Sequence, residues 1–177
     1  AFMEQLAPTY VDPVERENDI LNSLGLTKAD LLSNAPIQVV NTGNSFLLIP
    51  VKDVKTLEDI TPYFDAIENI SEEFNLIGYY VFTIDAVAEI DATTRMFAPR
   101  YGILEEAATG MAAGPLASYL FDVLQQKQTN FKIQQGKYMS PSSSSALEVQ
   151  LHVENEHITG VMAGGKGMVA SEFEVKI

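Results

Sequence analysis

The residues best suited to chemistry lie in Ala107-Ala108-Thr109-Gly110, a small-residue segment that opens a helical pattern. We expect Thr109 to be the N-cap, because its hydroxyl can accept a hydrogen bond from an amide two or three residues later. Gly110 has no Cβ atom, so another group can approach its backbone closely. Unpaired amides at a helix start attract an anion, with roughly 0.3–1 kcal/mol per charge in an exposed setting. The segment therefore predicts an anion-binding turn.

A strand and a helix must position this turn. Residues 91–97 are typical of a strand, and they lead through Ala98-Pro99 toward the small-residue segment. The helix that follows has apolar residues at three- and four-residue spacing, namely Ala112, Leu116, Tyr119, Leu120, Val123 and Leu124. This spacing predicts a helix that buries one face.

The rest of the chain predicts an α+β domain with a mixed sheet. Helices are expected over 14–24 and 56–69, and a hairpin over 37–51, where two apolar runs flank Thr42-Gly43-Asn44-Ser45. The apolar run 76–84 is typical of a central strand. Short strands are expected at 131–135, 147–153, 157–163 and 168–175, after a short extended segment over 1–10.

Composition excludes several classes of function. The net charge of −13 argues against nucleic-acid binding and against binding to anionic membranes, because both need clustered Lys and Arg. The absence of cysteine excludes disulfides and thiolate metal sites, and it fits a reducing, cytoplasmic location. His152 and His157 lie near acids, but their spacing across a hairpin is weak support for a metal site, and we expect none.

The stretch from Arg95 closely resembles the signature of the phenazine biosynthesis PhzF-like family. The matching residues are Arg95, Phe97, Ala98, Pro99, Gly102, Ile103, Glu105, Ala108, Thr109, Gly110 and Ala112. Glu106, Ala107 and Met111 depart from it, since the family has Asp, Pro and Ser there. Similar features elsewhere extend the resemblance over essentially the whole chain, but only over the second half of a family member.

The resemblance implies a fold, an activity and a set of site residues. The fold would be a half related to diaminopimelate epimerase, in which a curved mixed sheet wraps around a central helix. The activity would be an isomerase reaction without metal or organic cofactor, in which a proton moves on a small carboxylate substrate held between the halves. Glu106 would be the catalytic residue, and the substrate-binding residues would be Thr109, Gly110, Met111, Glu105, Thr42 and Gly43.

Other interpretations of these residues stay open. Glu106 is also well placed simply to favour the helix dipole, and we favour this structural role slightly over the catalytic one, whereas Glu105 could be an exposed loop acid. For Arg95 we favour an ion pair with Glu105 over contact with a substrate carboxylate. Thr42-Gly43 could be a simple turn.

The resemblance also sets expectations about organisation and partners. We expect residues 1–177 to form a single domain, with the family's N-terminal half absent and supplied in cis or in trans. The isolated chain would then be inactive, because that half carries the general base. We further expect a homodimer. The alternative is a non-catalytic domain of the same fold that binds a small ligand or mediates oligomerisation, which the loss of the family's Asp, Pro and Ser favours.

Overall fold

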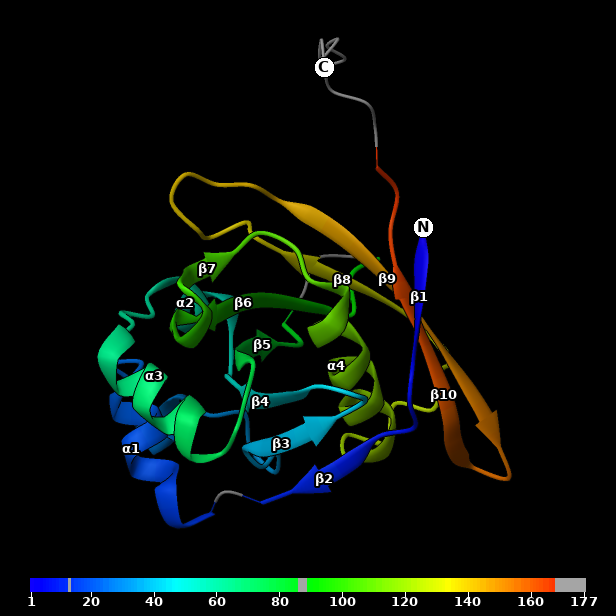
Figure 1. Cartoon of the computed structure of the whole chain (residues 1–177), viewed down its shortest axis with the longest axis horizontal. Coiled ribbons are helices and arrows are strands. Elements are labelled where there is room, and N and C mark those ends of the chain that lie inside the picture. The colour runs from blue at the N-terminus through cyan, green and yellow to red at the C-terminus, as the bar shows by residue number, and fades with distance from the viewer. Residues whose placement is uncertain (13, 86–88, 168–177) are drawn as a thin grey trace, which may run out of the picture.

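A computed structural model describes residues 1–12, 14–85 and 89–167 (Figure 1). The strands are β1 (Phe2–Gln5), β2 (Thr9–Val11), β3 (Gln38–Asn41), β4 (Ser45–Pro50), β5 (Gly78–Thr83), β6 (Ala92–Ala98), β7 (Ile103–Glu106), β8 (Asn130–Gln135), β9 (Ser145–Glu154) and β10 (His157–Gly164). The helices are α1 (Glu17–Asn22), α2 (Val54–Glu58), α3 (Phe64–Glu73) and α4 (Gly110–Asp122), with 3-10 turns η1 (Val14–Arg16), η2 (Lys28–Asp30) and η3 (Pro99–Tyr101).

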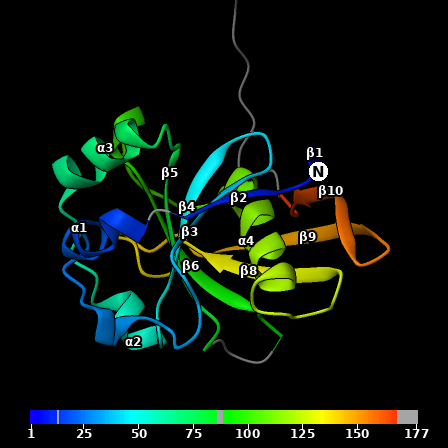
Figure 2. The same cartoon turned by 90° about the horizontal axis from the view of Figure 1, so that it is seen from below.

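The described strands form one sheet, in the order β1-β10-β9-β8-β6-β5-β4-β3-β2, with β7 paired to β6. The pairs β4–β5 and β6–β8 are parallel and the others are antiparallel, so the sheet is mixed. Its two edge strands, β1 and β2, are consecutive in the chain. Only residues 6–8 join them, and the Leu6 amide donates to the Thr42 carbonyl at 3.0 Å. The sheet therefore curls strongly, and α4 lies in its concave side (Figures 1 and 2).

The sheet carries a core on each side of its middle strands. On the concave side, every residue of α4 from Ala112 to Phe121 is buried against the sheet. On the convex side, α1, α2 and α3 cover the same strands (Figure 2). Strands β4 and β5 are buried on both faces, which explains their unbroken apolar sequences. This α+β architecture, with a curled sheet around one helix, confirms the expected fold.

Several local predictions are confirmed and one is wrong. The predicted hairpin is the β3–β4 pair, and the run 76–84 contains β5 in the middle of the sheet. The single helix predicted over 56–69 is instead α2 and α3, separated by residues 59–63. Pro62 in that gap has no amide to donate and disfavours helical backbone at Thr61. The strand predicted at 168–175 lies outside the described residues. None of the described helices is long and apolar enough to cross a membrane.

Candidate functional site: the start of the central helix

The turn that begins α4 leaves backbone donors unpaired. Thr109 is the N-cap, with extended φ and ψ of −144° and 112°, and the first intrahelical bond runs from Ala113 to its carbonyl at 3.3 Å. Within the described part of the chain, the amides of Gly110, Met111 and Ala112 have no hydrogen-bond partner. The position of the cap is as predicted. The predicted role of its hydroxyl is wrong, because the Thr109 side chain makes no capping bond.

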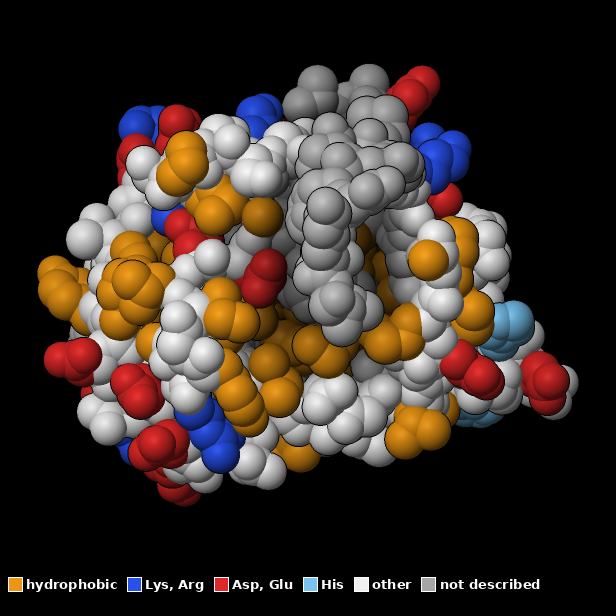
Figure 3. Space-filling model, turned by 45° about the horizontal axis from the view of Figure 1, so that its top comes forward, with side chains coloured by type: hydrophobic (Ala, Val, Ile, Leu, Met, Phe, Trp, Pro, Cys, Tyr) orange, Lys and Arg blue, Asp and Glu red, His pale blue; other side chains and the backbone are white. Residues whose placement is uncertain are grey.

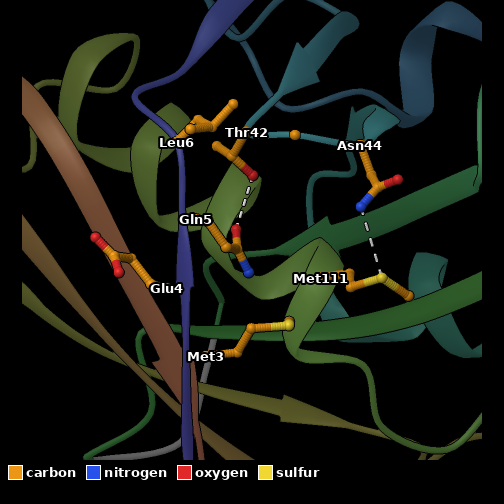
Figure 4. Close-up of a pocket in the computed structure, with 8 residues that line it drawn as sticks. Met3, Glu4, Gln5, Leu6, Thr42, Asn44 and Met111 are labelled. Carbon is orange, nitrogen blue, oxygen red and sulfur yellow. Dashed lines mark hydrogen bonds between the residues drawn. The ribbon is translucent and has the colours of Figure 1, made fainter.

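A cavity of about 360 Å³ opens beside this turn (Figure 4). It lies between β1, the β3–β4 turn and α4, and its lining residues are Met3, Glu4, Gln5, Leu6, Thr42, Gly43, Asn44 and Met111. Three predicted substrate-binding residues, Thr42, Gly43 and Met111, thus meet at one cavity although they come from distant parts of the sequence. No basic side chain lines it, and Glu4 points to the other side of β1 from Gln5 (Figure 4). An anion there would depend on neutral donors.

Gln5 connects the walls of this cavity. Its Nε2 atom donates to the Gly110 carbonyl at 2.8 Å, and its Oε1 atom accepts from the Thr42 hydroxyl at 2.7 Å. The side chain lies against Gly114, where a Cβ atom would come within 2.0 Å of Oε1. Sequence reasoning did not find Gln5, although a glycine inside a buried helix was a signal that some group approaches closely.

The two predicted acids lie side by side on β7 but have different surroundings. Glu105 forms a bidentate ion pair with Arg95, with Oε1 2.8 Å from Nε and Oε2 2.9 Å from Nη2. Arg95 is 7% exposed, and it also donates to the carbonyls of Leu57 and Ile60 at 3.3 and 3.2 Å. The predicted ion pair is confirmed. Glu105 is therefore held by Arg95 and does not line the cavity.

Glu106 points to the opposite face of β7, because neighbouring residues of a strand alternate. Its carboxylate has no hydrogen-bond partner among the described residues, and it is partly exposed. It does not line the 360 Å³ cavity either. Its carbonyl, however, accepts a hydrogen bond from Gln135, and Gln135 also binds the Thr109 amide. The catalytic role of Glu106 and the binding roles of the other predicted residues stay predictions.

The described residues contain no cluster of three or more His, Cys, Asp or Glu side chains that could hold a metal. His152 lies on β9 and His157 begins β10, at the far end of the β9–β10 hairpin from α4. On the face shown in Figure 3, apolar side chains gather toward the middle, and the Lys and Arg side chains visible there lie toward the margin.

Comparison with known proteins decides which family this geometry comes from. Residues 1–172 match the family described as Phenazine biosynthesis-like protein, also called PhzC-PhzF. The chain belongs to this family. An uncharacterized isomerase of Clostridium acetobutylicum is 34% identical over 166 residues, which are 91% of this chain and 54% of that protein. A trans-2,3-dihydro-3-hydroxyanthranilate isomerase of Pseudomonas fluorescens is 32% identical over 120 residues, or 68% of this chain and 39% of that enzyme.

The PhzF-family fold is also shared with solved structures. The Bacillus anthracis phenazine biosynthesis protein of the PhzF family aligns with a TM-score of 0.75 at 24% identity, over 93% of this chain and 56% of that one. The chain spans about half the length of the relatives it matches. The chain thus shares both the family and the fold of these proteins.

Proposed function

We propose that this chain forms one side of the substrate site of a PhzF-like isomerase that moves a proton on a small carboxylate without a cofactor. The amides of Gly110, Met111 and Ala112 would hold the carboxylate or the developing enolate. A further part of the protein, in cis or in trans, would form the opposite wall and supply a second proton-transfer group. The observation that carries this proposal is that the turn whose three amides have no partner among the described residues also contributes Met111 to the lining of a cavity large enough for a small molecule.

The chemistry needs few side chains from this half. A 1,3-proton shift requires a base near the carbon acid, a group that returns the proton, and donors placed where negative charge develops. Backbone amides supply the donors whatever the side chain at 111, so the change from the family's Ser to Met111 does not remove them. Glu106 ends β7 at the start of the loop that leads to α4, and its carboxylate has no partner among the described residues. We assign to it the holding or relay of a proton.

The substrate class follows from a relative. One relative's name gives trans-2,3-dihydro-3-hydroxyanthranilate as its substrate, which is a ring that bears a carboxylate. A carboxylate of this size suits the cavity and the neutral donors at α4. We therefore propose an unsaturated or cyclic carboxylate as the substrate, and a cytoplasmic location, which the absence of cysteine supports.

The test is turnover in D₂O by the chain alone and by the chain together with the rest of a family member. We expect isomerisation of trans-2,3-dihydro-3-hydroxyanthranilate, or of a related unsaturated carboxylate, with deuterium incorporated, only when both parts are present. Glu106→Gln should lower kcat by about 10²–10⁴-fold, the range for removal of a general acid or base. Full turnover by Glu106→Gln would contradict the assignment of Glu106. Failure of every carboxylate to react in the complete protein would contradict the isomerase proposal.

A second candidate is a non-catalytic domain that binds a ligand or associates with itself, as in a homodimer. The observation in its favour is the exposure of large apolar residues near the cavity, with Met3, Leu6 and Met111 exposed by 44%, 69% and 39%. Sedimentation of the chain over a range of concentrations separates the possibilities. A dimer that Leu6→Glu dissociates would support association through this face, and a monomer at all concentrations would contradict it.

A further inference from the structure

One buried side chain holds the loop between β7 and α4. Gln135, at the end of β8, is 0% exposed. Its Nε2 atom donates to the Glu106 carbonyl at 2.7 Å, and its Oε1 atom accepts from the Thr109 amide at 3.3 Å. These two backbone groups stand at the two ends of the loop, three residues apart. The Gln135 amide thus links the backbone of the candidate acid to the turn that carries the unpaired donors.

The orientation of this amide group is fixed by its partners. A backbone N–H can only donate and a backbone carbonyl can only accept, so Nε2 must face Glu106 and Oε1 must face Thr109. The Tyr80 hydroxyl adds a third bond, because it donates to Oε1 at 3.0 Å. Tyr80 is fully buried, and this burial raises the pKa of its hydroxyl above the ordinary value. Tyr80 therefore remains a neutral donor at physiological pH.

Gly136 allows β8 to come this close to the loop. Its φ of +77° lies in the left-handed region, and a Cβ atom there would lie 2.6 Å from the Ala107 carbonyl oxygen and 2.2 Å from that of Ser143. Both contacts are with backbone, which cannot move aside cheaply. The pair Gln135-Gly136 therefore combines a side chain that binds the loop with a backbone that touches it.

We propose that Gln135 is a positioning residue, which sets the place of the Glu106 carboxylate relative to the amides of residues 110–112. This inference rests on the proposed function, because it names the group that aligns the same site. Three-point fixation of a buried amide defines the loop more tightly than packing of Ala107 and Ala108 could, since neither of these side chains can form a hydrogen bond. A donor array for an anion acts only if it is held in place before the ligand arrives.

The experiment compares four proteins by ¹⁵N NMR without ligand and then with anthranilate: the wild type, Gln135→Met, Gln135→Glu and the matched control Gln134→Met. Gln134 neighbours Gln135 on β8, but its Nε2 atom donates to Ser144 at 3.3 Å instead of to the loop. We expect Gln135→Met to speed exchange of the Thr109 amide by about tenfold or more, because that amide loses its acceptor. The resonances of Gly110, Met111 and Ala112 should shift, and anthranilate should bind about tenfold more weakly.

Gln135→Glu should restore slow exchange at Thr109, because a carboxyl oxygen still accepts. While this carboxyl is ionised, the resonances of residues 110–112 should stay displaced, because the Glu106 carbonyl lacks a donor. When the carboxyl is protonated, its O–H can donate to that carbonyl and the resonances should return. Gln134→Met should behave as the wild type. The inference would be overturned if Gln135→Met kept the wild-type exchange rate at Thr109, the wild-type resonances at 110–112 or the wild-type affinity for anthranilate. It would also be overturned if Gln134→Met had the same effects as Gln135→Met. If Gln135→Met does not fold, exchange of the Thr109 amide in the wild type as fast as that of the unpaired amides at 110–112 would overturn it. If the wild type binds no anthranilate, the proposed carboxylate site fails, while the ligand-free measurements still decide the role of Gln135.

Discussion

Polar groups on the two faces of β7 differ in whether they have hydrogen-bond partners. On one side, Arg95 is buried and the Glu105 side chain is 14% exposed, and both side chains have close partners. On the other side, the Glu106 carboxylate and the amides at the start of α4 have no partners among the described residues. A largely buried ion pair whose hydrogen bonds are satisfied serves to stabilise the fold, and we call such groups the structural framework. Hydrogen-bond donors that have no partner near a cavity can instead bind a ligand. The contrast gives two adjacent acids on one strand different surroundings, as the ion pair predicted between Arg95 and Glu105 implies.

The largest effect is expected from Arg95→Met. This change leaves the Glu105 carboxylate buried without its partner and removes the donor to the carbonyls of Leu57 and Ile60. Removal of one partner of a buried ion pair costs about 3–5 kcal/mol. Urea unfolding should show a loss of this size. A loss below about 1 kcal/mol would mean that the pair is screened and that this side of β7 is not a framework.

Glu105→Gln should have the next largest effect, a loss of about 1.5–3 kcal/mol in the free energy of unfolding. The amide retains one acceptor for Arg95 but removes the charge and places an NH₂ group against the guanidinium. Chemical denaturation measures the change. If Glu105→Gln and the wild type had equal free energies of unfolding, Glu105 would not stabilise the fold, and the proposed difference between the two faces of β7 would be wrong.

Gly114→Ala should alter the cavity more than the stability. The new methyl group must displace the Gln5 amide, whose Oε1 atom would lie 2.0 Å away, so the bond from Gln5 to the Gly110 carbonyl breaks. Alanine gains little helix propensity at this position, because Gly114 precedes Pro115 and the proline ring disfavours helical backbone at a residue that carries a Cβ atom. The lost hydrogen bond should therefore lower the free energy of unfolding by about 1 kcal/mol. The Gly110 and Thr42 resonances should shift, and the melting temperature should fall by only a few degrees. Gln5→Ala is the control, and it should shift the same resonances.

Glu106→Gln should have the smallest effect on stability, within about 0.5 kcal/mol of the wild type, because its carboxylate makes no described bond. It is the matched control for Glu105→Gln, with the same chemical change one residue away. Calorimetry on both variants gives the comparison directly. A loss at Glu106 as large as that at Glu105 would show that Glu106 too belongs to the framework.

Local sequence pattern predicted the elements of this fold well. The β3–β4 hairpin, the central β5 run and the start of α4 at Thr109-Gly110 each follow from residue types within a few positions of one another. The prediction of one helix over 56–69 is wrong because Pro62, also a local signal, separates α2 from α3.

The partners of the site could not be predicted in the same way. Gln5 reaches Gly110 across 105 positions of sequence, and Gln135 reaches Glu106 across 29. The local sequence around a glutamine in a strand does not show whether its side chain will form a hydrogen bond with a distant backbone group. The Arg95–Glu105 pair was predictable because both residues lie on neighbouring strands only 10 positions apart.

Titration of the ¹⁵N-labelled chain with anthranilate tests the central claim most directly. The account predicts saturable shifts of the Gly110, Met111 and Ala112 amide resonances, with the Arg95 Nε–H resonance unchanged. Shifts that centre on Arg95, or none at residues 110–112 at millimolar ligand, would contradict it.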